Sequence, residues 1–513
     1  MSVRERFGVE GLRPLLSASG EDFELRSPVT GAVTGHLPTS TPADIDTAVT
    51  RARAAQLDWA ARPVAERAAV LLDLHDYLLD HRDAFVDLLQ TEGGKARLSA
   101  TEEVIHVALT ARYYGRRAAS YLRPERGEGV FPVLTRIDRI YVPKGLVGVI
   151  APWNYPLTMA LSDGLPALVA GNAVLLKPDH QTPLVALAGV EALRACGMPA
   201  DLWPVVLGPG DVVGPAVIDA SDYVCFTGST ATGRKVATRC AERLISCSLE
   251  LGGKNPLLVL DDADVETAAE GAVRASFSNA GQLCVSIERI YVAEPLMASF
   301  CAALTTRTES LRLGSGLDFE HDMGGLINAA QLTRVEAHVA DAKSKGATVL
   351  TGGRRREDLG EHFYEPTVLT GVTPEMHCYS EETFGPLVSV YPVADEQEAV
   401  DRANDSDYGL NASVWTGDPV RGRRVGKQLR CGTVNVNDGF AASFGSIDAP
   451  MGGMKSSGLG RRQGREGIRR FVEVQSVATQ SGPPIAPSHG LSPERFVSVM
   501  TGALRLIKKT GRA

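Results

Sequence analysis

Two side chains in this 513-residue sequence have the chemistry of a thioester mechanism, the thiol of Cys284 and the carboxyl group of Glu250. A thiolate can attack a carbonyl carbon and hold the acyl group as a thioester, and a separate carboxylate can activate the water that hydrolyses it. The chain has eight cysteines, and a free cysteine is often just a small buried apolar residue. Cys284 differs because it ends the run Asn-Ala-Gly-Gln-Leu-Cys, whose small and polar residues suit an open pocket.

Two other motifs carry polar groups at the ends of apolar runs. Residues 151–156, Ala-Pro-Trp-Asn-Tyr-Pro, follow a predicted strand, and the amide of Asn154 can donate to a developing oxyanion. Residues 176–183, Leu-Lys-Pro-Asp-His-Gln-Thr-Pro, end the next strand and place Lys177 beside a prospective ribose or phosphate. Each motif alone is equally compatible with a proline-bounded turn. Together with Cys284 and Glu250, in one order along one sheet, they predict a single site.

A candidate phosphate site lies at residues 226–233, Phe-Thr-Gly-Ser-Thr-Ala-Thr-Gly, where a strand should turn into a helix. Gly228 allows close backbone approach, and the first helical N–H groups can bind a pyrophosphate, although Ser229 or Thr230 could simply cap the helix. Residues 208–214 have the spacing G-x-G-x-x-x-G, which departs from the dinucleotide fingerprint. We interpret that run as a turn at the border of a cofactor site.

The elements that must position these residues alternate between helices and short apolar strands. Residues 43–89 have helical periodicity, residues 124–144 suggest an extended ribbon, and residues 183–196 form a helix that starts with Pro and is followed by Gly197. A second series follows from about residue 262. Short buried strands between helices predict parallel α/β sheets. The predicted strands are 146–150, 174–176, 205–207, 223–226, 257–260 and 289–292, with extended runs at 348–350 and 387–392, and the helices of the second series are 262–275 and 297–311.

Composition excludes several classes of protein. The length predicts two or three structural units, and 44% hydrophobic with 22% charged residues is typical of a globular protein. A net charge of -8 without a dense Lys/Arg stripe indicates no nucleic-acid partner, and the lack of a long apolar run indicates no membrane span. The cysteines form no CxxC pair and residues 1–20 lack a secretory pattern, so we expect a cytoplasmic protein with free thiols and no metal.

The C-terminal segment has a different character. Residues 481–489 contain three prolines and predict a linker. Residues 493–513 are basic with regularly spaced apolar side chains, which could lie on a membrane surface. A helix that docks on its own protein is the more ordinary expectation.

At these motifs the chain resembles the aldehyde dehydrogenase superfamily, from about residue 28 to residue 477. Segments 381–386, 408–412 and 450–458 also look like family signatures. The resemblance implies an α/β fold of two tandem Rossmann-like parallel-sheet domains with a small β-strand oligomerisation arm, hence a homodimer or homotetramer. The implied division is 1–123 with 146–253 for the dinucleotide, 254–449 for catalysis, 124–145 with 450–480 for the arm, and 481–513 for the linker and tail.

The resemblance also implies roles for individual residues. Cys284 is the nucleophile, Glu250 the general base, and Asn154 with the Cys284 N–H the oxyanion hole. Lys177 contacts the adenosine ribose and Glu382 the nicotinamide ribose. The implied cofactor-binding residues are Trp153, Asn154, Lys177, Asp179, His180, Gly228, Ser229, Leu251, Glu382 and Phe384.

The cofactor prediction depends on His180. Many NAD-preferring relatives have Glu at this position, whose carboxylate repels a 2′-phosphate. His180 removes that repulsion and Lys177 remains to attract the phosphate, which favours NADP. NAD stays possible, because His180 could be a surface turn residue and Asp179 is adjacent.

For the substrate, similarity is greatest to NADP-type succinate-semialdehyde dehydrogenases, which oxidise succinate semialdehyde to succinate. Family members hold the distal carboxylate with two arginines, whose positions here carry Ser162 and Ser278, while Ser446 matches a serine that contacts the same carboxylate. Loss of both guanidiniums weakens that recognition. A less polar aldehyde, with Phe440 and Phe444 as apolar walls, is therefore the alternative.

Three other classes are weaker alternatives. A CoA-acylating dehydrogenase would not need a base at Glu250, and a non-catalytic protein would be expected to lose Cys284, Glu250 or Asn154. A Cys–His hydrolase is disfavoured because His180 is the only histidine in the motifs.

Overall fold

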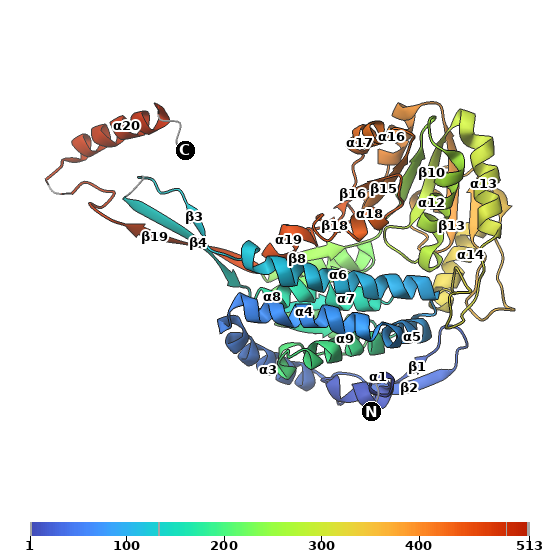
Figure 1. The fold of residues 1–513 in the computed structure, drawn as a ribbon, viewed down its shortest axis with the longest axis horizontal. Helices are drawn as coiled ribbons and strands as arrows, with labels where there is room; N and C mark the ends of the chain where they lie inside the picture. The colour runs from blue at the N-terminus through green and yellow to red at the C-terminus, as the bar shows by residue number, and fades with distance from the viewer. Residues whose placement is uncertain (1–2, 132–133, 489, 510–513) are drawn as a thin grey trace.

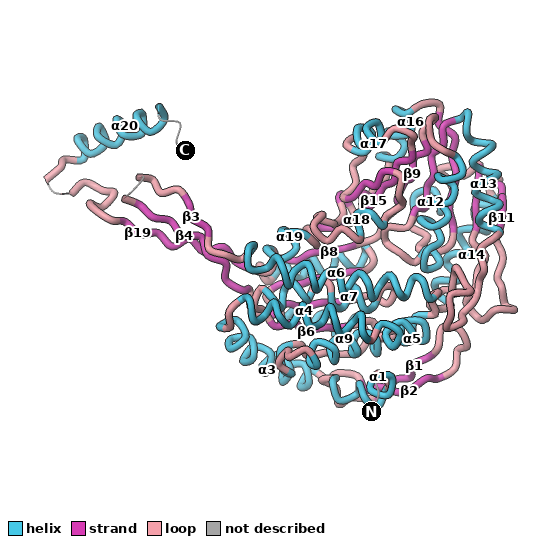
Figure 2. The backbone as a smooth tube through the Cα atoms, in the orientation of Figure 1, coloured by secondary structure: helices cyan, strands magenta, loops and turns pink. Residues whose placement is uncertain are grey.

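The computed structural model describes residues 3–131, 134–488 and 490–509, and it consists of two α/β bodies with a ribbon and a helix that project from the first body (Figure 1). Each body is a largely parallel sheet with helices on its faces, as the coloured trace shows (Figure 2). The predicted α/β class is therefore confirmed. Buried apolar side chains form one large core cluster that includes residues of both bodies.

The first body is built on a five-stranded sheet with the order β18-β8-β7-β5-β6. Strands β5 to β8 are parallel, and β18 pairs antiparallel with β8. The sheet strands are β5 Leu146–Ile150, β6 Ala173–Lys177, β7 Tyr223–Thr227, β8 Ser246–Glu250 and β18 Gly458–Leu459. The strand predicted at 205–207 is wrong: Val205 makes only single bridges, to Leu16 and Leu176, in the short connection before the next helix.

Helices cover both faces of this sheet. The helical stretch predicted over 43–89 is divided into three helices, because Arg62 is extended before Pro63 and His81 leaves helical geometry. The first of them starts with a capping box between Thr41 and Asp44. The helices are α3 Pro42–Ala61, α4 Val64–Asp80, α5 Arg82–Gly93, α6 Arg97–Tyr121, α7 Pro156–Leu161, α8 Gly164–Val169, α9 Pro183–Ala195, α10 Gly210–Ala220 and α11 Thr230–Glu242.

The second body contains a seven-stranded sheet with the order β11-β12-β13-β10-β9-β15-β16, parallel except for β11. Its strands are β9 Asn255–Val259, β10 Ile287–Ala293, β11 Thr348–Thr351, β12 Thr367–Thr370, β13 Leu387–Val393, β15 Asn411–Trp415 and β16 Thr433–Val436. Its main helices are α12 Val265–Phe277, α13 Met297–Glu309, α14 Ala329–Ser344, α16 Glu396–Asn404 and α17 Pro419–Gly426. The chain enters this body directly after Glu250, so the end of β8 lies at the junction.

Short elements complete the two bodies. They are α1 Val3–Arg6, α2 Val9–Leu12, η1 Arg13–Leu15, β1 Asp22–Arg26, β2 Val33–Pro38, η2 Ala200–Leu202, η3 Ser278–Gly281, η4 Glu294–Leu296, α15 His377–Ser380, β14 Tyr408–Gly409, α18 Ala441–Phe444, β17 Met454–Lys455 and α19 Gly464–Arg469.

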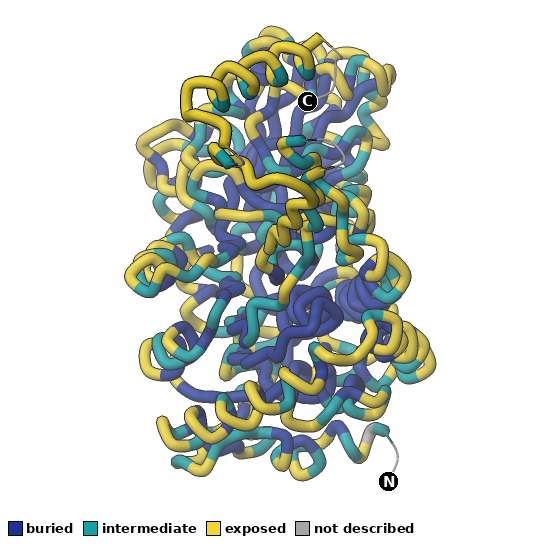
Figure 3. Tube along the Cα trace, turned by 90° about the vertical axis from the view of Figure 1, so that its left-hand side faces the viewer, coloured by how far each residue is buried: buried dark blue, intermediate teal, exposed yellow. Residues whose placement is uncertain are grey.

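A three-stranded antiparallel ribbon projects from the first body, formed by β3 Glu125–Gly127, β4 Thr135–Pro143 and β19 Val472–Gln480. It leads to α20 Pro493–Lys509, which stands away from both bodies (Figure 1) and has no buried residue (Figure 3). The expected docking of this helix on its own chain is thus not seen. Residues 132–133 of the predicted ribbon, and 489 and 510–513 of the predicted tail, lie outside the described residues. In the part of the chain that is described, no helix has the length and apolarity to cross a membrane.

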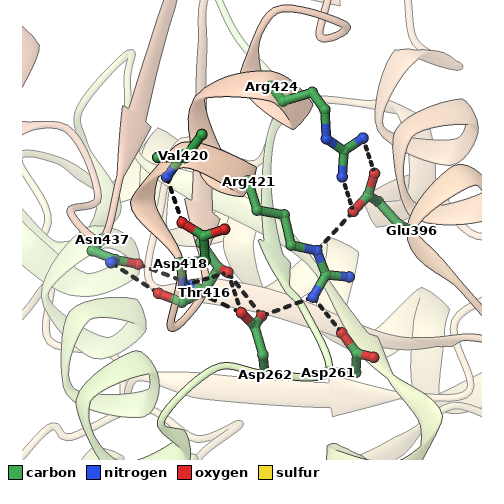
Figure 4. Close-up of polar contacts among 9 residues, drawn as sticks. All are labelled: Asp261, Asp262, Glu396, Thr416, Asp418, Val420, Arg421, Arg424 and Asn437. Carbon is green, nitrogen blue, oxygen red and sulfur yellow. Dashed lines mark hydrogen bonds and ion pairs between the residues drawn. The ribbon is translucent and has the colours of Figure 1, made fainter.

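An ion-pair network joins α16 and α17 to the loop after β9 (Figure 4). Arg421 lies at its centre, with Nη1 2.6 Å from Asp261 and 3.0 Å from Asp262, and Nε 2.9 Å from Glu396. Arg424 binds the same Glu396 carboxylate from the other side. One guanidinium therefore links three acidic residues on two separate segments.

We expect Arg421→Gln to lower the free energy of unfolding by about 1 kcal/mol, because a network of partly buried pairs contributes more than one exposed pair. Urea denaturation followed by circular dichroism measures the change. Arg423→Gln is the matched control, since Arg423 is exposed on the same helix and makes no ion pair with a described residue. Equal stability of the two variants would show that the network contributes nothing.

Candidate active site

The loop that carries Cys284 has an unusual backbone. Asn279, Ala280 and Gly281 in η3 all have positive φ, at 51°, 55° and 71°. Gly281 cannot be replaced without displacement, because a Cβ atom there would lie 2.1 Å from the carbonyl oxygen of Gly385. Left-handed backbone at residues other than glycine is strained and is concentrated at functional sites. The strained turn presents half-buried Cys284 just before β10.

Asn154 lies directly against this loop. Its Nδ2 donates to the carbonyl oxygen of Gln282 at 3.0 Å, two residues before Cys284, and its own carbonyl oxygen accepts from Lys95 Nζ at 2.7 Å. An amide nitrogen carries two hydrogens, so one N–H remains for another acceptor. The structure thus brings Asn154 and the loop that carries Cys284 together.

Glu250 is the last residue of β8 and only 5% exposed. Among the described residues its Oε1 has no hydrogen-bond partner. Burial raises the pKa of this carboxyl group to about 7, against an opposing effect of the Arg462 charge. A carboxyl group that titrates near neutral pH can act as a general base under physiological conditions.

Cys284 and Glu250 are electrostatically coupled. Burial and then the Glu250 charge raise the pKa of the Cys284 thiol to about 12, while Arg462 acts in the opposite direction. The thiol is therefore protonated at neutral pH in this state, and a base must take its proton before attack. Glu250 is a carboxyl group that acts electrostatically on this thiol and whose own pKa lies near neutrality.

This coupling predicts that Glu250→Gln makes Cys284 more reactive toward iodoacetamide. Removal of the carboxylate charge lowers the pKa of the thiol, so more thiolate is present at each pH below that pKa. The alkylation rate of the Cys284 peptide, followed by mass spectrometry between pH 7 and pH 10, measures the effect. Cys301, which is half-buried and free, is the internal control whose rate should stay the same. An unchanged Cys284 rate would show that the two groups do not interact.

A cavity of about 880 Å³ opens beside the carboxyl ends of β5, β6 and β7. Five predicted cofactor residues line it, namely Trp153, Lys177, Asp179, Gly228 and Ser229. Ser229 caps α11 by accepting from the Thr232 N–H, and a Cβ atom on Gly228 would lie 2.7 Å from the Phe226 ring. This narrow glycine turn before a helix N-terminus fits a pyrophosphate. The glycine-containing run 208–214, predicted to border the cofactor site, supplies Gly210, Asp211 and Gly214 to the same lining.

The other predicted cofactor residues gather at the junction between the bodies. Glu382 Oε1 accepts from the Gly253 N–H at 2.7 Å, two residues after Leu251 in the chain. Phe384 packs edge-on against Trp153, with ring centroids 5.7 Å apart. Burial raises the pKa of Glu382 to about 7. Residues from both bodies therefore meet between the cavity and Cys284.

Among the predicted cofactor residues, His180 lies elsewhere. Its side chain lines a neighbouring cavity of about 580 Å³ together with Arg26, Gln181 and Glu361. Its Nδ1 lies 3.4 Å from Asp179 Oδ1. In this structure Lys177 and Asp179 face the dinucleotide cavity, and His180 does not line it.

The predicted substrate residues differ in their surroundings. Phe444 stacks on His106, with centroids 4.0 Å apart, and packs edge-on against Tyr155. Ser446 is exposed and its hydroxyl donates to the Ala442 carbonyl oxygen at 2.6 Å. Among the described residues the buried Ser162 hydroxyl has no partner. Phe444 thus belongs to an aromatic cluster with His106 and Tyr155, whereas the Ser446 hydroxyl is bonded within its own turn.

Several residues that support the site belong to none of the sequence motifs. Lys95 holds Asn154 and pairs with Glu103 in a nearly fully buried ion pair at 2.9 Å. Glu103 in turn accepts from the N–H groups of Leu157 and Thr158 at the start of α7. The alternation of helices and strands does not indicate that α6 lies beside the Asn154 motif. Spatial proximity alone identifies these supporting groups.

Comparison with known proteins agrees with this geometry. The profile of the "Aldehyde dehydrogenase family" matches residues 15–477. A Mycolicibacterium smegmatis protein named "Putative succinate-semialdehyde dehydrogenase [NADP(+)]" is 50% identical over 502 residues, with 97% of each chain covered. A Mycobacterium tuberculosis protein of the same name with the number 2 is 50% identical over 480 residues, 94% of this chain and 93% of the other.

Solved structures of aldehyde dehydrogenases are also similar to this chain. An NAD+ complex of an aldehyde dehydrogenase from Bacillus cereus is 35% identical, with a TM-score of 0.85 and coverage of 90% of this chain and 93% of the other. An NADP-dependent enzyme from E. coli is 34% identical, with a TM-score of 0.86 and coverage of 90% and 95%. The chain therefore belongs to the aldehyde dehydrogenase family.

Proposed function

We propose that the protein oxidises an aldehyde to a carboxylic acid with a nicotinamide dinucleotide, through a thioester on Cys284. The observation that carries this proposal is that Asn154 contacts the loop of Cys284, while the buried carboxyl group of Glu250 ends β8 at the junction of the two bodies. A nucleophile and a base with a near-neutral pKa are the groups that acyl formation and hydrolysis require. Measurement of NADPH absorbance with a panel of aldehydes and both dinucleotides tests it, and no turnover with any aldehyde would contradict it.

In the proposed reaction Cys284, Glu250 and Asn154 each have a separate role. The Cys284 thiol loses its proton to Glu250 and attacks the aldehyde carbon. The oxygen of the resulting thiohemiacetal anion accepts the free N–H of Asn154 and the backbone N–H of Cys284, a contribution of several kcal/mol when such donors are preorganised. Lys177, Gly228 and Ser229 would hold an oxidised nicotinamide dinucleotide, which would supply the hydride acceptor as the thiohemiacetal anion becomes the thioester. Glu250 passes the proton of the thiol to solvent and then takes a proton from water as the water attacks the thioester carbon. Collapse of the resulting intermediate breaks the C–S bond, and the Cys284 thiolate takes the proton back from Glu250 as the carboxylic acid leaves.

NADP is the dinucleotide we assign, with NAD as an alternative. The two mycobacterial relatives carry NADP in their names, and Lys177 and Lys235 line the cavity that fits the dinucleotide. Lys235 is exposed on α11 and its ammonium group makes no ion pair with a described residue. This free cation supports binding of a 2′-phosphate more directly than His180 does.

Lys235→Gln is expected to raise the KM for NADP about tenfold and to leave the KM for NAD nearly unchanged, because only NADP has the second anion to pair. Steady-state kinetics with both dinucleotides at one aldehyde concentration measures the two values. Arg234→Gln is the matched control, since the neighbouring Arg234 is equally exposed on α11 but does not line the cavity. Equal rises for NADP and NAD would exclude a contact with the 2′-phosphate.

Succinate semialdehyde is the substrate that we propose, because the relatives that are 50% identical are named for it. The aromatic cluster of Phe444 and His106 favours the alternative, a less polar aldehyde. A comparison of kcat/KM for succinate semialdehyde and for butanal, of similar length without the carboxylate, distinguishes the two. Equal values would remove the substrate assignment and leave the chemistry intact. Glu250 argues against transfer to CoA, and an unchanged rate on addition of CoA is expected.

We further propose self-association through the projecting ribbon, as a homodimer or homotetramer in a cytoplasmic, reducing setting. β19 is an edge strand with one buried residue, and unpaired edges favour pairing with another chain. All eight cysteines are free, which suits a reducing compartment. Analytical ultracentrifugation of the full chain tests the assembly, and a monomer at micromolar concentration would contradict it.

A further inference from the structure

A buried group of charges includes Arg462, which follows by four residues the Gly458 that pairs with Glu250 across β18 and β8. Asp163, between α7 and α8, has Oδ1 2.6 Å from Arg470 Nη2 and 3.2 Å from Arg462 Nη2. The side chains of Asp163, Arg462 and Arg470 are 3%, 4% and 9% exposed. We call these three residues the buried triad. Arg462 Nη1 also lies 3.2 Å from the Met159 sulfur, which fixes the guanidinium in the core.

The buried triad is not neutral by itself. Two guanidiniums face one carboxylate, so one positive charge is left over, and an unpaired charge in the interior is costly. Among the described residues, Arg470 Nη1 and Nε have no hydrogen-bond partner, and Arg462 Nη2 faces Asp163 without hydrogen-bond geometry. Glu250 Oε1 is likewise without a partner. An ionised Glu250 balances the surplus charge, whereas a protonated Glu250 leaves it uncompensated.

The surroundings of Glu250 offer few other charges. The neighbouring strands place Thr227 and Gly458 opposite it, and neither is titratable. α11, which packs on β8, directs Arg239 away to an ion pair with Asp219. Besides the buried triad, the charged or titratable groups that act on Glu250 or respond to it are Arg461 and Cys284.

We propose that Arg462, held in place by Asp163, is a positioning residue that favours the ionised form of the general base Glu250. This inference rests on the proposed role of Glu250 in thioester hydrolysis. The order of influences on the pKa of Glu250 agrees with it: after burial, Arg462 lowers the pKa most, Asp163 raises it, and Arg470 and Arg461 lower it less. The same Arg462 charge opposes the rise in the pKa of the Cys284 thiol. One buried guanidinium therefore acts on both reacting groups.

The test uses hydrolysis of 4-nitrophenyl acetate by the full-length enzyme. This ester acylates Cys284 with release of nitrophenolate and needs no dinucleotide, so the steady rate after the burst reports the hydrolysis that Glu250 assists. The rate should rise with pH as Glu250 loses its proton. Arg462→Gln should move the midpoint of that rise upward by about one pH unit, and Asp163→Asn should move it downward.

Three comparisons make the result decisive. Arg462→Lys keeps the charge and should restore the wild-type midpoint, and Arg461→Gln should give the smaller shift expected from its weaker influence. The inference requires Asp163→Asn and Arg462→Gln to shift the midpoint in opposite directions. A merely structural role would change the two variants in the same way, so opposite shifts exclude it. Shifts in one direction, or loss of rate without any shift, would overturn the inference. The Glu250→Gln variant separates the two proposals, since a pH-dependent rise that persists in it would contradict the role of Glu250 itself.

Discussion

Replacement of Cys284 by serine is expected to lower kcat/KM for aldehyde oxidation by about four orders of magnitude or more. A hydroxyl is a far weaker acid than a thiol, so Glu250 with a pKa of about 7 cannot produce the alkoxide in useful amounts, and an ester replaces the thioester. The side chain keeps nearly the same volume, so the loss is one of chemistry. NADPH formation at 340 nm with succinate semialdehyde measures it.

The control for this prediction is Cys301→Ser on α13, a half-buried free cysteine outside the site, which should keep wild-type activity. Binding of NADPH, followed by its fluorescence, should be unchanged in both variants because the dinucleotide cavity is intact. A Cys284→Ser enzyme that kept a tenth or more of the wild-type activity would show that another group carries the acyl intermediate.

The second large effect is expected at Glu250. Glu250→Gln has nearly the same shape but no base, so thioester hydrolysis should slow by about 10²- to 10⁴-fold. Acyl formation depends on the thiolate of Cys284, whose pKa falls when the carboxylate is removed, so a burst of NADPH should persist at alkaline pH before the slow steady rate. Stopped-flow absorbance separates the burst from the later turnover.

Exposed Glu294 in η4 provides the control, since Glu294→Gln lies outside the site and should leave both phases unchanged. A steady rate in Glu250→Gln equal to the wild-type rate would assign hydrolysis to another base. Loss of both phases at alkaline pH would instead place Glu250 entirely in the attack of the thiol.

Much of the fold could be predicted because local patterns decide it. The runs at residues 146–150 and 223–226 are short, apolar and bounded by turn residues, and they form the buried strands β5 and β7. The run at 205–207 is also short and apolar, yet in it only Val205 forms β-bridges, one to Leu16 and one to Leu176. The apolar composition of a run indicates that it is buried, but whether it pairs as a β-strand depends on which strand lies beside it in the fold. Patterns along the chain do not contain that information.

The C-terminal tail shows a second limit of prediction from sequence. Periodic apolar residues over 493–513 predict a helix, and α20 forms over the described part. Amphipathicity suggests that an apolar face will be covered, but it does not identify what covers it. A linker with Pro483, Pro484 and Pro487 separates this helix from the bodies, and no residue of it is buried on them.

The site was predictable where a motif carries the chemistry, and not where charges converge from distant segments. Cys284, Glu250 and Asn154 are predicted from their neighbours in sequence, and the structure brings Asn154 to the loop of Cys284. Arg462 could not be found in this way, because its importance comes from burial beside Asp163, almost three hundred positions earlier in the chain. A charged residue in sequence is normally an exposed one.

The most direct test of the thioester account is the mass of the acyl-enzyme. Glu250→Gln enzyme mixed with NADP and succinate semialdehyde at alkaline pH, quenched in acid within the burst, and digested should yield a Cys284 peptide heavier by one succinyl group. The same treatment of Cys284→Ser should yield no adduct on any cysteine. An NADPH burst without an acyl group on Cys284, or with the acyl group on a different residue, would contradict the account.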